Sequence, residues 1–200
     1  MVHPRRFDLL RTLGLPDFLT LANGACGVVA LFQAIRFVED KDIAHLWIAC
    51  SLIPIALVLD LLDGWVARAR EASSSLGREL DSLADLLSFG AAPAAIAYAV
   101  GLRTVADQAV LVFFTLCGLA RLARYNISAD ALADSHGKVR YYEGTPIPTS
   151  VVPLAITLGA YSGEAIFATR LFGVALHWPS LLFALSGSLM IAKRLRIPKP

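Results

Sequence analysis

The sequence predicts an all-α integral membrane protein with six transmembrane helices and both termini in the cytoplasm. Of the 200 residues, 56% are hydrophobic and 17% are charged. Because soluble domains carry about 25% charged residues, this composition indicates a bilayer environment. Long uncharged runs give the helices, and the unequal distribution of basic residues gives their orientation.

An N-terminal segment, residues 1–14, precedes the first apolar run. Phe7, Leu10 and Leu13 fall on one side of a helix drawn through it, and its three arginines fall mostly elsewhere. The pattern fits an amphipathic helix lying on an anionic leaflet, and a frayed tail fits it equally well. Residues 15–197 are expected to form one six-helix membrane domain.

Six segments are apolar enough to cross a bilayer. A span needs about 20 residues, or somewhat fewer where polar ends reach the interface. Several spans contain a proline, which membrane helices tolerate as a kink. The expected spans are residues 18–35, 43–59, 86–102, 104–125, 144–163 and 171–192.

Basic residues concentrate on one side of these spans, the side that holds both termini. Of the 18 Lys and Arg residues, fourteen fall there and four fall on the other side. The positive-inside rule therefore makes the first side cytoplasmic. The turn between the second and third helices lies on this side, as does the connection between the fourth and fifth. The four exceptions are Arg36, Lys41, Arg103 and Arg170.

Four aspartates lie near the cytoplasmic ends of the second and third helices. Asp60 and Asp63 are three residues apart, and Asp81 and Asp85 are four apart, so each pair shares a helix face. The polar turn between them lets the pairs face each other. At an effective dielectric of about 20, two carboxylates about 4 Å apart repel by roughly 4 kcal/mol. Divalent cations remove this repulsion, and oxygen ligands favour Mg²⁺, Mn²⁺ or Ca²⁺ over zinc or copper.

Gly64, Ala67 and Arg68 follow Asp63 directly. The two small residues leave space for a bulky ligand such as a nucleotide, and Arg68 can hold a phosphate. Taken alone, these three residues are better explained by tight helix packing and a positive-inside anchor.

The complete pattern resembles the signature of the CDP-alcohol phosphotransferase family. It reads Asp60-x-x-Asp63-Gly64-x-x-Ala67-Arg68, eight residues, and Gly77-x-x-x-Asp81-x-x-x-Asp85. The resemblance implies a six-helix membrane enzyme, commonly a homodimer, that transfers a phosphatidyl or similar group from a CDP-linked donor to an alcohol and releases CMP. It implies two metal ions held by the four aspartates, with Asp85 also acting as the base. It assigns Gly64, Ala67, Arg68 and Gly77 to the CDP site.

Other stretches are similar to the phosphatidylserine synthase branch of this family. They are residues 77–90, 118–126 and 142–148, and the opening stretch 15–23 adds Thr20 and Asn23 to the expected CDP site. Asp17 and Thr145 depart from the branch, in which Asn and a larger apolar residue are common. The branch implies CDP-diacylglycerol as the donor and L-serine as the acceptor.

Four residues are candidates for binding serine. Arg121 and Arg124 are three apart on one helix face, and a guanidinium fork suits the carboxylate of serine. Asn126 and Glu143 are candidates to accept from its ammonium group. The alternatives are positive-inside anchoring for the arginines and an ion pair with a nearby basic residue for Glu143.

Several alternatives remain open. Within the family these are an inositol-phosphate or glycerol-phosphate acceptor and an archaeal ether-lipid donor. Outside it, carboxylates in a membrane protein also suit a divalent-cation transporter, but the sequence shows no repeated halves and puts the aspartates at helix ends.

The expected location is a bacterial or archaeal cytoplasmic membrane, or the endoplasmic reticulum, with the active site facing the cytoplasm. Expected cofactors are two Mg²⁺ or Mn²⁺ ions, with Ca²⁺ as a substitute in vitro. Expected partners are the CDP-lipid, serine, membrane lipids and a second copy of the chain, without nucleic acid.

Overall fold

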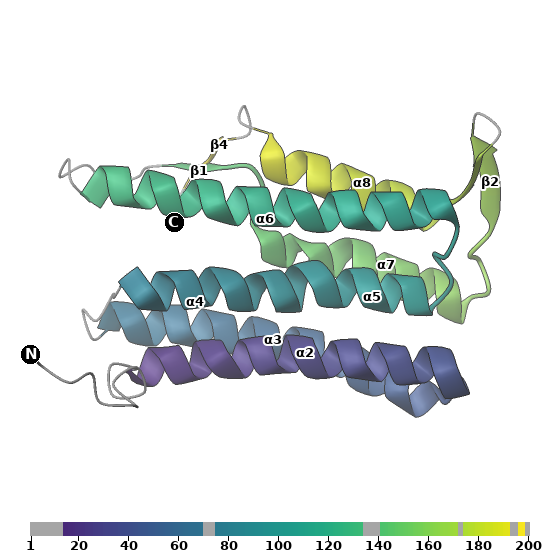
Figure 1. Cartoon of the computed structure of the whole chain (residues 1–200), viewed down its shortest axis with the longest axis horizontal. Helices are drawn as coiled ribbons and strands as arrows, with labels where there is room; N and C mark the ends of the chain where they lie inside the picture. Colours follow the sequence, from purple (N-terminus) through teal and green to yellow (C-terminus); the bar gives the residue numbers. More distant parts are fainter. Residues whose placement is uncertain (1–13, 70–74, 134–140, 172–173, 193–195, 199–200) are drawn as a thin grey trace, which may run out of the picture.

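The first two helices form a long antiparallel pair in the computed structural model (Figure 1). Helix α2 spans Leu15–Asp40 and helix α3 spans Ile43–Ala69. Pro16 suits the first turn of α2 because it lacks an N–H group, and Asp17 accepts a hydrogen bond from the backbone N–H of Gly14 at 2.7 Å. Fully buried alanines on both helices let their backbones approach closely.

The structure describes residues 14–69, 75–133, 141–171, 174–192 and 196–198. The expected interfacial helix at residues 1–14 lies almost entirely outside these ranges, so it stays a prediction.

The third helix begins earlier than the hydropathy pattern predicts. Helix α4 (Ser75–Asp85) continues without a break through η1, a π-helical turn (Leu86–Ala91), into α5 (Ala92–Ala99). The expected span began at residue 86, because the polar residues of α4 lower the hydropathy of that turn. Asp81 and Asp85 therefore lie well inside a helix, and Asp85 directly precedes the π-helical turn. Helix α6 (Val105–Ala133) follows.

The last two helices are shorter than expected. The predicted spans 144–163 and 171–192 begin too early, since the helices are η2 (Ile147–Ser150) with α7 (Val151–Ser162), and α8 (Trp178–Ile191). Gly144 has a φ of 78° and two prolines follow within four residues, which delays the fifth helix. Pro179 in the first turn of α8 suits a helix that starts there.

Two short ribbons accompany the helices and were not predicted. Strands β2 (Ala168–Leu171) and β3 (Val174–His177) pair antiparallel before α8. Strands β1 (Tyr141–Glu143) and β4 (Arg196–Pro198) pair antiparallel at the other end of the bundle. The chain is therefore mostly helical rather than strictly all-α.

Within the described part of the chain, four helices are long and apolar enough to cross a membrane, and they cover residues 15–40, 43–69, 75–99 and 105–127. Two shorter apolar helices cover residues 147–162 and 178–191. At 1.5 Å per residue, the last spans about 21 Å, less than the roughly 30 Å hydrocarbon core. Large apolar side chains such as Phe32 and Trp47 are more than half exposed, as expected for a surface that faces lipid.

The helices alternate in direction, so their ends collect at two ends of the bundle. The end of α3, the start of α4 and the end of α6 lie together at one end (Figure 1). The α2–α3 connection and the β2–β3 ribbon lie at the other. Between them, Phe114 of α6 and Phe183 of α8 pack edge to face with ring centroids 5.2 Å apart.

Candidate active site

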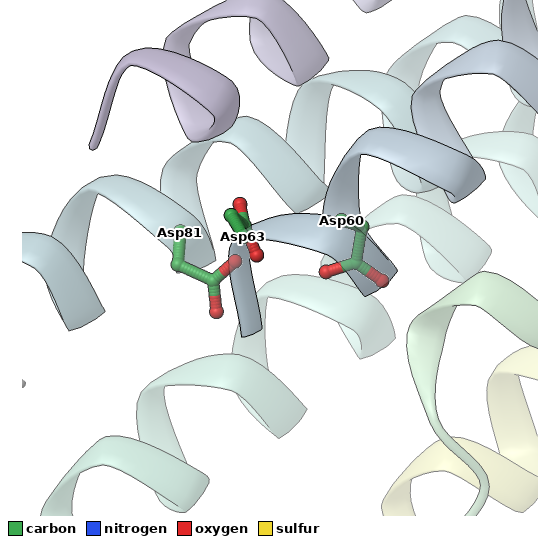
Figure 2. Close-up of side chains that lie close together, drawn as sticks. All are labelled: Asp60, Asp63 and Asp81. Carbon is green, nitrogen blue, oxygen red and sulfur yellow. The ribbon is translucent and has the colours of Figure 1, made fainter. Parts of the chain in front are cut away.

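Two helices bring three carboxylates together at one end of the bundle. Asp60 and Asp63 lie on one face of α3, and Asp81 lies on the adjoining α4. One oxygen of each can be chosen so that all three lie within 4.8 Å of one another (Figure 2). The sequence prediction that the two helices present their aspartates to each other is therefore confirmed for these three. Asp85 is not part of the triplet.

All four aspartates line one pocket of about 640 Å³. Asp60 and Asp81 are partly exposed, whereas Asp63 and Asp85 are buried, at 5% and 7% exposure. The lining combines charged side chains with apolar ones, which suits a ligand with a polar head and an apolar tail. Its residues are Leu57, Asp60, Leu61, Asp63, Gly64, Arg68, Asp81, Asp85, Arg121, Tyr125, Pro146, Pro148 and Thr149.

Two side chains of helix α2, outside the pocket lining, donate hydrogen bonds to two of the carboxylates. Thr20 donates from its hydroxyl to Oδ2 of Asp63 at 2.7 Å. Asn23 donates from Nδ2 to Oδ1 of Asp85 at 3.2 Å. Thr20 and Asn23 are 4% and 0% exposed and are absent from the pocket lining, so their nearest role is to contact the aspartates rather than a ligand.

The electrostatics of the triplet favour a cation. Oδ1 of Asp81 is buried and has no hydrogen-bond partner among the described residues. An unpaired buried carboxylate oxygen is costly. The positive charge of Arg121 acts favourably on both Asp60 and Asp81. Among the described residues, two arginines, Arg68 and Arg121, line the pocket with four aspartates. The excess negative charge and the all-oxygen donor set fit a divalent ion such as Mg²⁺ or Mn²⁺.

The residues predicted to bind CDP divide into three groups. Gly64 and Arg68 line the pocket, and a side-chain carbon built on Gly64 would lie 3.5 Å from Nη1 of Arg68. Ala67 and Gly77 are partly buried near the ends of α3 and α4, outside the pocket lining. Thr20 and Asn23 lie behind the carboxylates. The CDP-binding role of each residue stays a prediction, and the geometry favours Gly64 and Arg68.

The residues predicted to bind serine do not all line the pocket. Arg121 lines the pocket and is itself 8% exposed. Arg124 donates to the carbonyl oxygens of Met190 and Ile191 at the end of α8. Asn126 exchanges hydrogen bonds with the hydroxyl of Ser82, at 3.0 and 3.2 Å, and thereby joins α6 to α4. The side chain of Glu143 lies outside the described part of the structure.

A family model described as CDP-alcohol phosphatidyltransferase matches residues 13–186 of the chain. The chain belongs to this family. The resemblance inferred from the aspartate pattern is therefore confirmed over most of the sequence.

Several relatives in this family are named for the transfer of a lipid phosphate group to serine. The chain is 43% identical to the CDP-diacylglycerol–serine O-phosphatidyltransferase of Saccharomyces cerevisiae, over 97% of this chain and 74% of the relative. It is 33% identical to the protein of the same name from Bacillus subtilis, over 74% of this chain and 77% of the relative. It is 34% identical to the archaetidylserine synthase of Methanothermobacter thermautotrophicus, over 72% of this chain and 57% of the relative.

In this CDP-alcohol phosphatidyltransferase, some pocket residues were not singled out from the sequence as ligand contacts. Tyr125 lines the pocket, and the guanidinium carbon of Arg121 lies 5.8 Å from the centre of its ring. The available signal was its spacing, because residues four apart share a helix face. Pro146, Pro148 and Thr149, at the start of η2, also line the pocket, and no local sequence pattern brings them to the aspartates.

Proposed function

We propose that this chain transfers the phosphatidyl group of CDP-diacylglycerol to the hydroxyl group of L-serine, forming phosphatidylserine and CMP. Family membership supports the reaction class, and the names of the yeast and Bacillus relatives support the donor and acceptor. The observation that carries the proposal is the meeting of Asp60, Asp63 and Asp81 in a pocket that Asp85 and Arg121 also line.

The aspartates would hold two divalent ions, Mg²⁺ or Mn²⁺, with Ca²⁺ as a substitute in vitro. Asp60, Asp63 and Asp81 would supply most of the ligands, with Asp85 at the edge of the site. Bound there, the ions would neutralise the donor diphosphate and stabilise the departing CMP. Gly64 leaves room beside the carboxylates, and Arg68 would pair with a phosphate oxygen. Ala67 and Gly77 would border the nucleotide.

Asp85 would act as the base. It would take the proton from the serine hydroxyl as that oxygen forms a bond to the phosphorus attached to the lipid. The bond from this phosphorus to the CMP oxygen breaks, and CMP leaves with the electron pair. The position of Asp85 in the pocket wall but outside the triplet supports a role distinct from that of the other aspartates.

Arg121 would bind the carboxylate of serine, since its guanidinium lies in the same pocket as Asp85. Leu57 and Leu61, two apolar residues of the pocket lining, would contact the lipid end of the donor. Roles for Arg124, Asn126 and Glu143 in serine binding are weaker proposals, because the first two side chains contact other parts of the protein.

The enzyme would cross the membrane six times, with the pocket and both termini on the cytoplasmic side. The alternating helix directions and the excess of basic residues at the aspartate end support this orientation. The two shorter helices would cross with the help of their flanking ribbons and loops. The membrane would be a bacterial or archaeal cytoplasmic membrane, or the endoplasmic reticulum, and the enzyme would act as a homodimer.

A second candidate keeps serine as the acceptor and changes the lipid. The archaetidylserine synthase among the relatives supports an ether-lipid donor, and the apolar side chains of Leu57 and Leu61 distinguish no lipid type. Acceptors that carry a phosphate would need more cations than Arg68 and Arg121 supply. A cation transporter is disfavoured by the family match.

The test is CMP release by the purified enzyme in detergent. CDP-diacylglycerol, or its ether-lipid analogue, is combined with Mn²⁺ or Mg²⁺ and with serine, glycerol 3-phosphate or inositol phosphate. We expect activity with serine alone, loss of activity on chelation, and recovery with Mn²⁺ or Mg²⁺ but not Zn²⁺. Asp85→Asn should abolish turnover while the protein still inserts and folds. Turnover with glycerol 3-phosphate but not serine would contradict the proposed acceptor.

A further inference from the structure

Helix α2 supplies two hydrogen bonds to the pocket carboxylates and no carboxylate of its own to the pocket wall. The two bonds run from Thr20 to Oδ2 of Asp63, at 2.7 Å, and from Asn23 to Oδ1 of Asp85, at 3.2 Å. Thr20 and Asn23 are three residues apart, so both point from one face of α2. All four side chains are less than 10% exposed.

Each bond occupies one oxygen of a carboxylate that also lines the pocket. We propose that Thr20 and Asn23 are positioning residues, which fix the orientation of Asp63 and Asp85 so that each carboxylate presents its other oxygen to the pocket. Donors behind metal-binding and catalytic side chains commonly have this effect. The inference rests on the proposed function, in which Asp63 is a metal ligand and Asp85 is the base.

The packing of α2 keeps these donors in place. The hydroxyl of Ser88, in the π-helical turn η1, donates to the backbone carbonyl of Asn23 at 2.8 Å. A side-chain carbon on Gly24 would lie 3.3 Å from Cβ of Ala84. One on Gly27 would lie 2.8 Å from the backbone nitrogen of Ser88. The backbone of α2 thus lies directly against the helix that carries Asp85, next to a π-helical turn of the kind often found at functional sites.

The alternative is that the Thr20 and Asn23 hydrogen bonds are ordinary polar contacts that hold buried helices together. The amide of Asn23 argues against it. Its Oδ1 is buried and without a hydrogen-bond partner among the described residues, and its Nδ2 donates to the carboxylate. A residue chosen only for packing would gain nothing from an unpaired amide oxygen.

The two bonds should affect different measurements. Thr20 contacts Asp63, which belongs to the triplet that suits a metal ion. Asn23 contacts Asp85, which lies outside the triplet. Loss of the Thr20 hydroxyl should therefore weaken metal binding, and loss of the Asn23 amide should slow turnover. Changes of about 10- to 100-fold are typical when such supporting groups are removed.

The test uses the full-length enzyme in detergent. Mn²⁺ binding is measured by calorimetry without substrate, and kcat and KM are measured for CMP release at saturating Mn²⁺. Thr20→Val should raise the Mn²⁺ dissociation constant about 10-fold or more, and Thr20→Ser should restore it. Asn23→Leu should lower kcat about 10-fold or more, with KM for serine within about twofold of wild type and a smaller rise in the Mn²⁺ dissociation constant than Thr20→Val causes. Asn23→Ala serves if the leucine variant does not fold.

Two control variants separate orientation from packing. Thr157→Val removes another buried hydroxyl, which donates to the carbonyl of Pro153 four residues back, as Thr20 also does to Pro16. Thr115→Val removes a partly buried hydroxyl that donates to the carbonyl of Leu111 within α6, at 3.0 Å. Both controls should keep wild-type Mn²⁺ affinity and kcat.

The outcomes are distinct. Wild-type Mn²⁺ affinity in Thr20→Val, or wild-type kcat in the Asn23 variants, would overturn the corresponding assignment. Equal losses in either control would point to packing. If the wild-type enzyme binds Mn²⁺ but releases no CMP with serine, the proposed function fails, while the effect of Thr20 on metal affinity can still be measured.

Discussion

Arg124, near the end of α6, donates from Nη1 to the carbonyl oxygen of Ile191 at the end of α8, at 3.3 Å. Its Nη2 donates to the carbonyl oxygen of Met190. The last carbonyl groups of a helix have no partners within that helix. Arg124 therefore supplies donors where α8 ends, and a cation there also interacts favourably with the helix dipole.

Replacing Arg124 with Gln should consequently affect stability more than catalysis. We expect a loss of about 1–3 kcal/mol in the free energy of unfolding, with KM for serine within about twofold of wild type. Thermal unfolding in detergent and steady-state kinetics on the folded fraction measure the two effects. A large rise in KM at unchanged stability would instead support the serine-binding role suggested by the sequence.

Arg121 should show the opposite behaviour because it lines the pocket. Serine methyl ester, which lacks the acceptor carboxylate, is the probe. Wild-type kcat/KM should be about 100-fold higher for serine than for the ester, as expected for a charge-assisted pair of about 3 kcal/mol. Arg121→Ala should lower activity with both substrates and reduce this preference to below about fivefold. A preference that survives the substitution would move the carboxylate site elsewhere.

The core of the candidate site could be predicted because helix geometry is regular. Spacings of three and four residues fix which aspartates share a face. The few residues between α3 and α4 keep the end of one and the start of the other at the same end of the bundle (Figure 1). The same reasoning was insufficient for Arg121 and Arg124. They share a face by spacing, but their long side chains reach different neighbours, one the aspartates and the other α8.

The parts that sequence reasoning missed depend on tertiary packing. A short apolar run is compatible with either a strand or a helix. The predicted sixth span therefore included β3 and began too early. The polar side chains of Thr20 and Asn23 suit a nucleotide as well as a neighbouring carboxylate. Only the packing of α2 against α3 and α4 reveals that they contact the aspartates.

Asp107 provides a test at the far end of the bundle. It is fully buried and accepts hydrogen bonds from the backbone and ring of His177, the hydroxyl of Ser180 and the backbone N–H of Thr104. These contacts tie the start of α8 to the start of α6. Because several donors lose their acceptor at once, Asp107→Ala should lower the free energy of unfolding by about 3 kcal/mol or more.

The effect of Asp107→Ala should be confined to stability. Ser51→Ala is the control, since the hydroxyl of Ser51 is exposed and donates to the carbonyl of Trp47 within its own helix. We expect this variant to unfold like wild type, and the kcat of the folded Asp107 variant to be unchanged. A loss of kcat without a loss of stability would mean that this end of the bundle takes part in the reaction.

Gly27 and Gly159 form a matched pair of helical glycines that should respond in opposite ways to alanine. At Gly27 a methyl group would lie 2.7 Å from the hydroxyl oxygen of Ser88 and 2.9 Å from the backbone carbon of Leu87, and backbone atoms cannot rotate away. At Gly159 a methyl group would meet no described atom within 4 Å apart from its chain neighbours and the adjacent backbone of its own helix. Gly159→Ala should be neutral or stabilise the helix by up to about 1 kcal/mol.

Gly27→Ala should push α2 away from η1 and lower stability. It should also weaken both Mn²⁺ binding and turnover, because the donors on α2 would move away from Asp63 and Asp85. Unfolding in detergent, Mn²⁺ calorimetry and CMP release measure these effects. Wild-type Mn²⁺ affinity and kcat in Gly27→Ala would mean that the close approach of α2 to η1 is dispensable for the site.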